Sequence, residues 1–140
     1  MALSVKDPIE LIVEKNKVVD IRGGKNALIL ANDFLKIERN VRKLVRKGYL
    51  DKNTGKIYID NMKALGEFGM GVNKKCNARG INNMEDEKAF GTAHIAFGAN
   101  YDGDQKALNH MDAVMKSPEV CFVYPNGKEE LIVKNNKIYV

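Results

Sequence analysis

Hydrophobic and polar residues alternate at both ends of the chain in the way that β-hairpins require. Residues 9–21 form two runs rich in valine and isoleucine around a Lys-Asn-Lys turn, and Gly23-Gly24 close them. Residues 119–140 form further strands, which are separated by Pro-Asn-Gly and by Asn-Asn. The pattern predicts an opening hairpin and a closing β-meander. Their similar sequences suggest that the two hairpins are neighbours in one sheet.

The hydrophobic period becomes helical between residues 32 and 47, and Gly48 suits the end of that helix. One face is apolar, and the lysines and arginines lie elsewhere, where they form a solvated face. The apolar face consists of Phe34, Ile37, Val41, Leu44 and Val45. Residues 51–56 (DKNTGK) have the composition of a turn, followed by a short run at 57–59 and a linker to Leu65.

The middle of the chain predicts more β structure. Residues 67–73 (EFGMGVN) alternate apolar residues with glycines, so something is expected to approach this strand closely. Residues 84–91 favour a short helix, 92–98 favour a strand, and 98–109 form a polar loop. We expect an α+β fold, mainly antiparallel sheet with hairpins at both ends and one longer amphipathic helix. Residues 1–140 fit a single domain.

Composition narrows the functional classes. Much of the net charge of +5 lies in one helix and in scattered lysines beside turns, and there is no basic run with interleaved aromatics, so we expect no nucleic-acid partner. No apolar run is long enough to cross a membrane, and the first ten residues do not resemble a secretion signal. Cys76 and Cys121 lack the spacing of a zinc knuckle and are interpreted as reduced thiols. We expect a cytoplasmic protein.

The two histidines of the chain are the first candidates for chemistry. His110 and Asp112 have the H-x-D spacing, which places both side chains on one face of a strand, although an exposed polar pair has the same spacing. His94 lies in the apolar run 92–97, where a buried core histidine is also expected. Together, two imidazoles and a carboxylate form the ligand set of many Zn, Mn and Fe(II) sites. Glu67 offers a further oxygen ligand.

Tyr101 lies in a loop that can bring its phenol over such an ion, or it is an ordinary surface tyrosine. The acidic residues 85–87 fit a hard cation or a solvated helix start equally well. The sequence contains no Walker loop, HExxH, GxSxG or GxGxxG pattern, so the commonest nucleotide-binding and protease signatures are absent.

Three segments resemble one family of metalloenzymes. GEFGMGVN at 66–73, NMEDEKAFGTAHIAFGANY at 83–101 and HMD at 110–112 are similar to the C-terminal domain of the thermophilic aminopeptidases. These are the aminopeptidase T and aminopeptidase S type, dimetal exopeptidases of the leucyl aminopeptidase-like metallopeptidases. The resemblance implies that Glu67, His94, His110 and Asp112 bind a divalent ion such as Zn, Co or Mn. It places Tyr101 in the same active site.

The resemblance also implies peptide substrates, catalytic roles for Glu67 and Tyr101, and a homodimer. The family enzymes are about three times longer, with an N-terminal domain and an upstream glutamate ligand that have no counterpart in these residues. The loop between Tyr101 and His110 is also short for the family. We therefore expect a hydrolase domain with weak or no activity alone.

Two alternatives remain at this stage. The bacterial dihydroxypyridine dioxygenases are similar at His94, His110 and Asp112, which implies a mononuclear Fe(II) site with open coordination positions. A non-catalytic metal-binding or partner domain is the other alternative. The ligands alone do not assign the chemistry.

Overall fold

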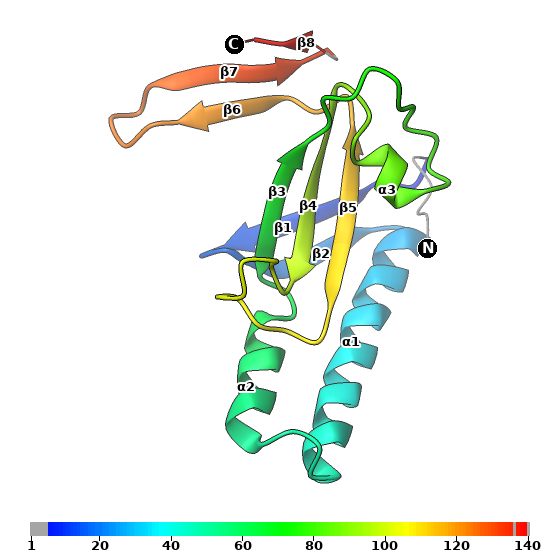
Figure 1. Cartoon of the computed structure of the whole chain (residues 1–140), viewed down its shortest axis with the longest axis vertical. Coiled ribbons are helices and arrows are strands. Elements are labelled where there is room, and N and C mark those ends of the chain that lie inside the picture. Colours follow the sequence, from blue (N-terminus) through cyan, green and yellow to red (C-terminus); the bar gives the residue numbers. More distant parts are fainter. Residues whose placement is uncertain (1–5, 136, 140) are drawn as a thin grey trace. The chain divides into compact units, whose positions relative to one another are not determined.

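The computed structural model describes residues 6–135 and 137–139 (Figure 1). Within this part of the chain, the helices and antiparallel sheets form an α+β fold, which confirms the predicted class. The elements are β1 (Ile9–Glu14), β2 (Lys17–Gly23), α1 (Lys25–Arg46), α2 (Lys52–Asn61), β3 (Leu65–Met70), α3 (Asn83–Asp86), β4 (Thr92–Gly98), β5 (His110–Lys116), β6 (Val120–Val123), β7 (Glu129–Lys134) and β8 (Lys137–Ile138). The strands form three sheets in the orders β1-β2, β3-β4-β5 and β6-β7-β8.

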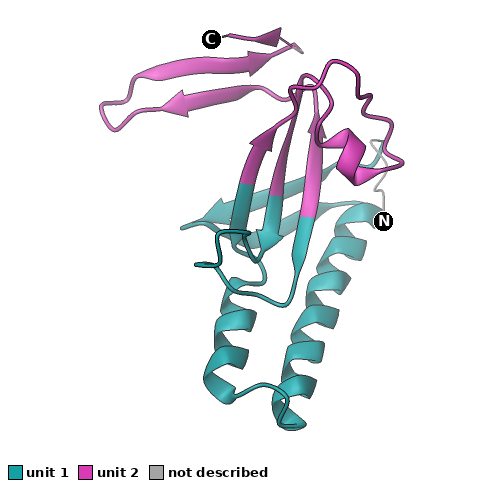
Figure 2. Cartoon of the chain, in the orientation of Figure 1, with its two compact units in different colours: residues 1, 3–67, 96–111 teal, residues 2, 68–95, 112–140 magenta. Residues whose placement is uncertain are grey.

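The chain divides into two compact units (Figure 2). Among the described residues, the first contains 6–67 and 96–111, and the second contains 68–95, 112–135 and 137–139. Strands β3, β4 and β5 each contribute residues to both units. One domain over the same residues is the prediction from the sequence.

The first unit opens with the predicted hairpin. β1 and β2 pair antiparallel from Ile9 opposite Gly23 to Glu14 opposite Lys17. Lys15 and Asn16 make the turn with φ values of 48° and 65°, the positive values that favour a tight hairpin. The Lys-Asn-Lys turn of the sequence analysis is confirmed.

Helix α1 begins seven residues before the start at residue 32 that the sequence predicts. Its extra turns are fixed by Asp7, whose carboxylate accepts the backbone N–H of Asn26 at 2.7 Å. The Asn26 side chain donates in return to the Asp7 carbonyl at 2.8 Å. Because this bond joins residues 19 positions apart, the local period did not reveal the helix start. Ala27, Phe34 and Val41 form the buried stripe of the helix.

Helix α2 replaces the turn that DKNTGK predicts, so that prediction is wrong. Asp51 caps the helix, because its Oδ1 accepts the backbone N–H groups of Asn53 and Thr54, both at 3.0 Å. Gly55 then contacts the side chain of Val45 so closely that a Cβ at this position would clash. A residue typical of turns therefore serves here as the point where α1 and α2 approach each other.

The second unit contains the closing β-meander. β6 pairs antiparallel with β7, and β7 with β8, as the sequence predicts. The Asn-Asn turn includes Asn136, which lies outside the described residues. The expectation that the opening and closing hairpins are neighbours in one sheet is wrong, since β1-β2 and β6-β7-β8 form separate sheets.

The short helix predicted in residues 84–91 is confirmed only over residues 84–86, because α3 ends at Asp86 and the chain then turns. Asn82 caps it by accepting the backbone N–H of Met84 at 3.2 Å. Asp86, although acidic, is buried and accepts the backbone N–H of Arg79 at 2.6 Å. This carboxylate therefore holds the preceding loop, and the acidic cluster is not simply a solvated helix start. None of the described helices is long and apolar enough to cross a membrane.

Candidate metal centre

Glu67, His110 and Asp112 are brought together by the central strands. Glu67 lies in β3, and His110 and Asp112 lie two residues apart in β5, where alternate residues share a face. One ligand atom from each side chain lies within 4.8 Å of the other two, and all three residues are half-buried. Among the described residues, this is the one group of histidine, cysteine and acidic side chains with the spacing of a metal site.

The hydrogen bonds of His110 define how its ring is presented. Nδ1 lies 2.6 Å from the backbone carbonyl oxygen of Ala99, which can only accept, so Nδ1 carries a proton. Nε2 lies 3.4 Å from Oε2 of Glu67. Nε2 and this carboxylate can interact through a second ring proton or through a cation held between the two groups.

This arrangement fits a divalent ion. Metal-binding histidines commonly donate their second ring N–H to a backbone carbonyl, which fixes the tautomer and the ring direction. One imidazole nitrogen and two carboxylates suit Zn, Mn or Fe(II). The His110 and Glu67 side chains are 20% and 29% exposed, so the charges are partly shielded from water and yet accessible to an ion.

Asn109 holds the start of β5 in place. Its side-chain amide donates to the carbonyl oxygens of Met62 and Phe97, both at 3.0 Å. The backbone carbonyl of Asn109 accepts the backbone N–H of Ala99 at 2.7 Å. The sequence analysis did not single out Asn109 or Ala99; the available signal was an asparagine directly before the histidine, at the end of a polar loop.

Gly66 brings β3 close to the loop beside His110. A Cβ at Gly66 would lie 2.7 Å from the carbonyl oxygen of Gly98, so only glycine fits without a shift of the backbone. Glu67 follows Gly66 directly in β3. The expectation that something closely approaches the glycines of residues 67–73 is confirmed at Gly69, against which the His94 ring lies, and at Gly71, which lies against the backbone carbonyl of Ala89.

Tyr101 lies beside His110, and its role in an active site remains a prediction. The two ring centroids are 4.7 Å apart, with the planes tilted by 51°. The tyrosine is 86% exposed, so its phenol is accessible to a molecule that binds over the ring of His110. The geometry places Tyr101 at the edge of the candidate centre.

His94 has a different environment from the other predicted ligands. It is 3% exposed in β4, and its ring lies directly against Gly69. The group of Glu67, His110 and Asp112 does not include it. Its surroundings match the alternative of a buried core histidine, and its role as a ligand remains a prediction.

Comparisons with protein-family models, with curated proteins and with solved structures found no match to this chain. The resemblance to the thermophilic aminopeptidases therefore rests on the three sequence segments described above.

Proposed function

We propose that the chain binds one divalent metal ion through Glu67, His110 and Asp112 and acts as a hydrolase domain of the metallo-aminopeptidase type. The observation that carries the metal site is the direction of the His110 ring. Its Nδ1 donates to the Ala99 carbonyl, Nε2 lies 3.4 Å from a Glu67 carboxylate oxygen, and one ligand atom from each of Glu67, His110 and Asp112 lies within 4.8 Å of the other two. The assignment as a hydrolase rests, in addition, on the resemblance of residues 66–73, 83–101 and 110–112 to the aminopeptidases.

The residues around the site support a peptide-cleaving chemistry. When bound, a divalent ion lowers the pKa of a coordinated water to about 7 and polarises a carbonyl group. Glu67 can accept a proton from the attacking water at a carboxylate oxygen. The Tyr101 hydroxyl, exposed beside His110, can donate a hydrogen bond to the developing oxyanion. These roles extend the proposal and require a peptide substrate with a free amino end.

The donor set distinguishes the proposal from the oxygenase alternative. A mononuclear Fe(II) oxygenase site uses two histidines and one carboxylate. The group brought together here has one histidine and two carboxylates, with His94 outside it. A hydrolytic or purely metal-binding site is therefore the better match.

We also propose a cytosolic location. Cys76 and Cys121 are both free thiols, and Cys121 is exposed on β6. Exposed free thiols are typical of a reducing compartment.

Metal analysis and turnover of aminoacyl anilides together test the proposal. The purified chain, stripped with a chelator and then dialysed against Zn²⁺ or Mn²⁺, is expected to retain one ion per chain. His110→Ala should lose it. Glu129→Gln, which removes an exposed acid from β7, is the matched control and should retain it.

Each outcome assigns a different function. Metal retention with anilide turnover that disappears in His110→Ala supports the hydrolase. Retention without turnover leaves a metal-binding domain and rejects the catalytic part. An Fe(II)-dependent uptake of oxygen supports the oxygenase instead, and equal metal content in His110→Ala and the parent chain rejects the site itself.

A further inference from the structure

The formal net charge of the chain lies on one helix. Residues 25–47, which are α1 and the residue after it, contain seven basic and two acidic residues. The other 16 basic and 16 acidic residues of the chain balance each other. A charge concentrated in this way creates a local positive potential that attracts anionic partners.

The positive helix also has an ordered outer stripe. Its members recur at alternating steps of four and three residues, the spacing at which one helix packs along another. All are exposed, and the two leucines among them are 66% and 48% exposed at positions 28 and 35. The stripe consists of Leu28, Asn32, Leu35, Arg39, Arg42 and Arg46. It lies apart from the buried stripe of Ala27, Phe34 and Val41.

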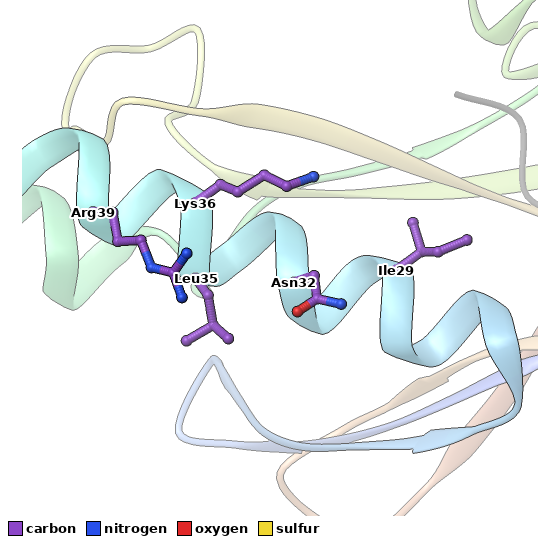
Figure 3. A pocket seen from close by; sticks show the side chains of 5 residues that line it. All are labelled: Ile29, Asn32, Leu35, Lys36 and Arg39. Carbon is purple, nitrogen blue, oxygen red and sulfur yellow. The ribbon is translucent and has the colours of Figure 1, made fainter.

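A cavity of about 210 Å³ opens along this stripe (Figure 3). Leu35 and Ile29 give it an apolar lining, and Asn32, Lys36 and Arg39 surround them with polar groups. Figure 3 shows Asn32, Leu35 and Arg39 following one another along the helix. Such a cavity fits a branched apolar side chain whose neighbours are acidic.

Part of the positive charge is already neutralised within the helix. Lys36 pairs with Asp33 at 2.7 Å, and Arg42 pairs with Glu38 at 2.6 Å. Within the described part of the chain, Arg39 and Arg46 of the outer stripe form no ion pair with an acidic side chain. These two side chains are the ones available to a carboxylate from outside.

We propose that the outer stripe of α1 docks an acidic amphipathic helix of a partner protein. Leucines of the partner would pack on Leu28 and Leu35 and enter the cavity, and its flanking carboxylates would pair with Arg39 and Arg46. A helix of 22 residues is about 33 Å long, so the partner segment needs about 20 residues. Asn32 within the stripe would fix the register, as a polar residue at a helix seam does.

The positive charge and the exposed leucines of the stripe together favour an acidic helix over a second copy of the chain or a nucleic acid. A second copy of this chain would place two helices of the same positive charge against each other, which is unfavourable. A nucleic acid would pair with the arginines but would make no use of the exposed leucines, and the aromatic residue of α1, Phe34, is buried. An acidic amphipathic helix uses both features.

Fluorescence anisotropy on the full chain tests this proposal. The probe is a fluorescein-labelled peptide of about 20 residues, with leucines at alternating steps of four and three and glutamate at the flanking positions. The matched peptides have lysine in place of glutamate, or serine in place of leucine. A labelled single-stranded RNA and vesicles with an anionic lipid test the other anionic partners at about 0.15 M salt.

Two variants and one control locate the binding surface. Arg39→Glu/Arg46→Glu reverses the charge of the stripe, and Leu28→Ser/Leu35→Ser removes its apolar part. Lys52→Glu/Lys56→Glu makes the same change of charge on exposed residues of α2. We expect the Kd for the Leu-Glu peptide to rise about tenfold or more in each stripe variant, and to change little in the control. All substituted residues are exposed, and circular dichroism verifies that the helices remain.

Three results would overturn the proposal. The first is equal affinity for the glutamate and lysine peptides. The second is full affinity in the leucine variant or an equal loss in the α2 control. The third is tighter binding of RNA or anionic vesicles than of the Leu-Glu peptide, which would assign the stripe to a polyanion or a lipid surface. The test does not involve the metal centre, so it is independent of the proposed hydrolase.

Discussion

The imidazole ring of His94 lies directly against Gly69, in the space that the side chain of any other residue would occupy. Both residues belong to the second unit, and His94 is 3% exposed. The ring therefore fills a gap that exists because position 69 has no Cβ. The two residues form one packing element.

This contact predicts that Gly69→Ala lowers the free energy of unfolding by about 1–3 kcal/mol, because the added methyl group overpacks the site. Urea denaturation measures the loss. The control is a double-mutant cycle with His94→Ala, in which the ring is gone and the alanine at position 69 should cost much less. An equal cost in both backgrounds would show that the glycine is needed for another reason.

The metal centre predicts a stabilisation by zinc. At free Zn²⁺ of about 100 times Kd, the free energy of unfolding should rise by about 2.7 kcal/mol, because the ion binds the folded chain. Glu67→Gln keeps the shape of the side chain and removes one anionic ligand, so its stabilisation should be smaller. Using a Cys76→Ser/Cys121→Ser background excludes binding by the thiols. An undiminished zinc effect in Glu67→Gln and Asp112→Asn would contradict the proposed ligands.

The cap of α2 predicts an acid-sensitive stability. Hydrogen bonds from Thr54, first from its hydroxyl and then from its backbone N–H, lower the pKa of Asp51 below its ordinary value of 3.8. A carboxyl whose folded pKa is lowered stabilises the fold above its unfolded pKa. That contribution is lost as the pH falls through the folded pKa.

Two variants separate this effect from general acid unfolding. At neutral pH, Asp51→Ala should lower the urea midpoint, whereas Asp51→Asn retains a capping oxygen and should lower it less. The difference between the parent chain and Asp51→Ala should shrink as the pH falls below the unfolded pKa. A difference that stays constant from neutral to acidic pH would mean that the ionised carboxylate has no part in the cap.

The amino-acid pattern predicts the elements that depend on near neighbours and misses those that depend on distant ones. The hairpin at Lys15-Asn16 and the closing meander follow from local alternation and turn residues. The start of α1 is tied to Asp7, and Gly55 of α2 packs against Val45. Neither contact is visible in a window of a few residues. The cap of α2 by Asp51 is local, but DKNTGK also has the composition of a turn.

In the candidate site, too, the local features were predictable from the sequence and the distant contacts were not. The shared face of His110 and Asp112 follows from their spacing in one strand, and the glycines around Glu67 predict a close approach to that strand. The carbonyl of Ala99, which fixes the ring of His110, has no signature in the sequence because any residue supplies a carbonyl. Its position depends on the path of the loop between Gly98 and Asn109, which only the folded chain defines.

The exposed edge strand β6 predicts that the chain associates with itself. β6 is at the edge of the sheet β6-β7-β8, and Cys121, Phe122 and Val123 on it are exposed. We predict that two copies pair through this edge, because an exposed apolar edge strand is a template for another chain. Light scattering should give twice the chain mass of 15.7 kDa. Phe122→Lys should reduce it to the chain mass.

The control for this prediction is Val19→Lys, which changes an exposed residue of β2 and should leave the dimer intact. A mass of 15.7 kDa for the parent chain at every concentration would reject the dimer. A dimer that survives Phe122→Lys and is lost in Val19→Lys would move the interface to the opening hairpin.

The bonds of Asn109 have a consequence for how this protein can vary between species. Its side chain joins the carbonyls of Met62 and Phe97, so the start of β5 is fixed independently of the loop before it. Insertions or deletions within residues 101–108 can change the length of that loop while His110 keeps its direction. A deletion between Asn109 and Asp112 would turn the strand by one residue and point a ligand to the opposite face. Natural length variation should therefore be confined to the loop and stop at Asn109.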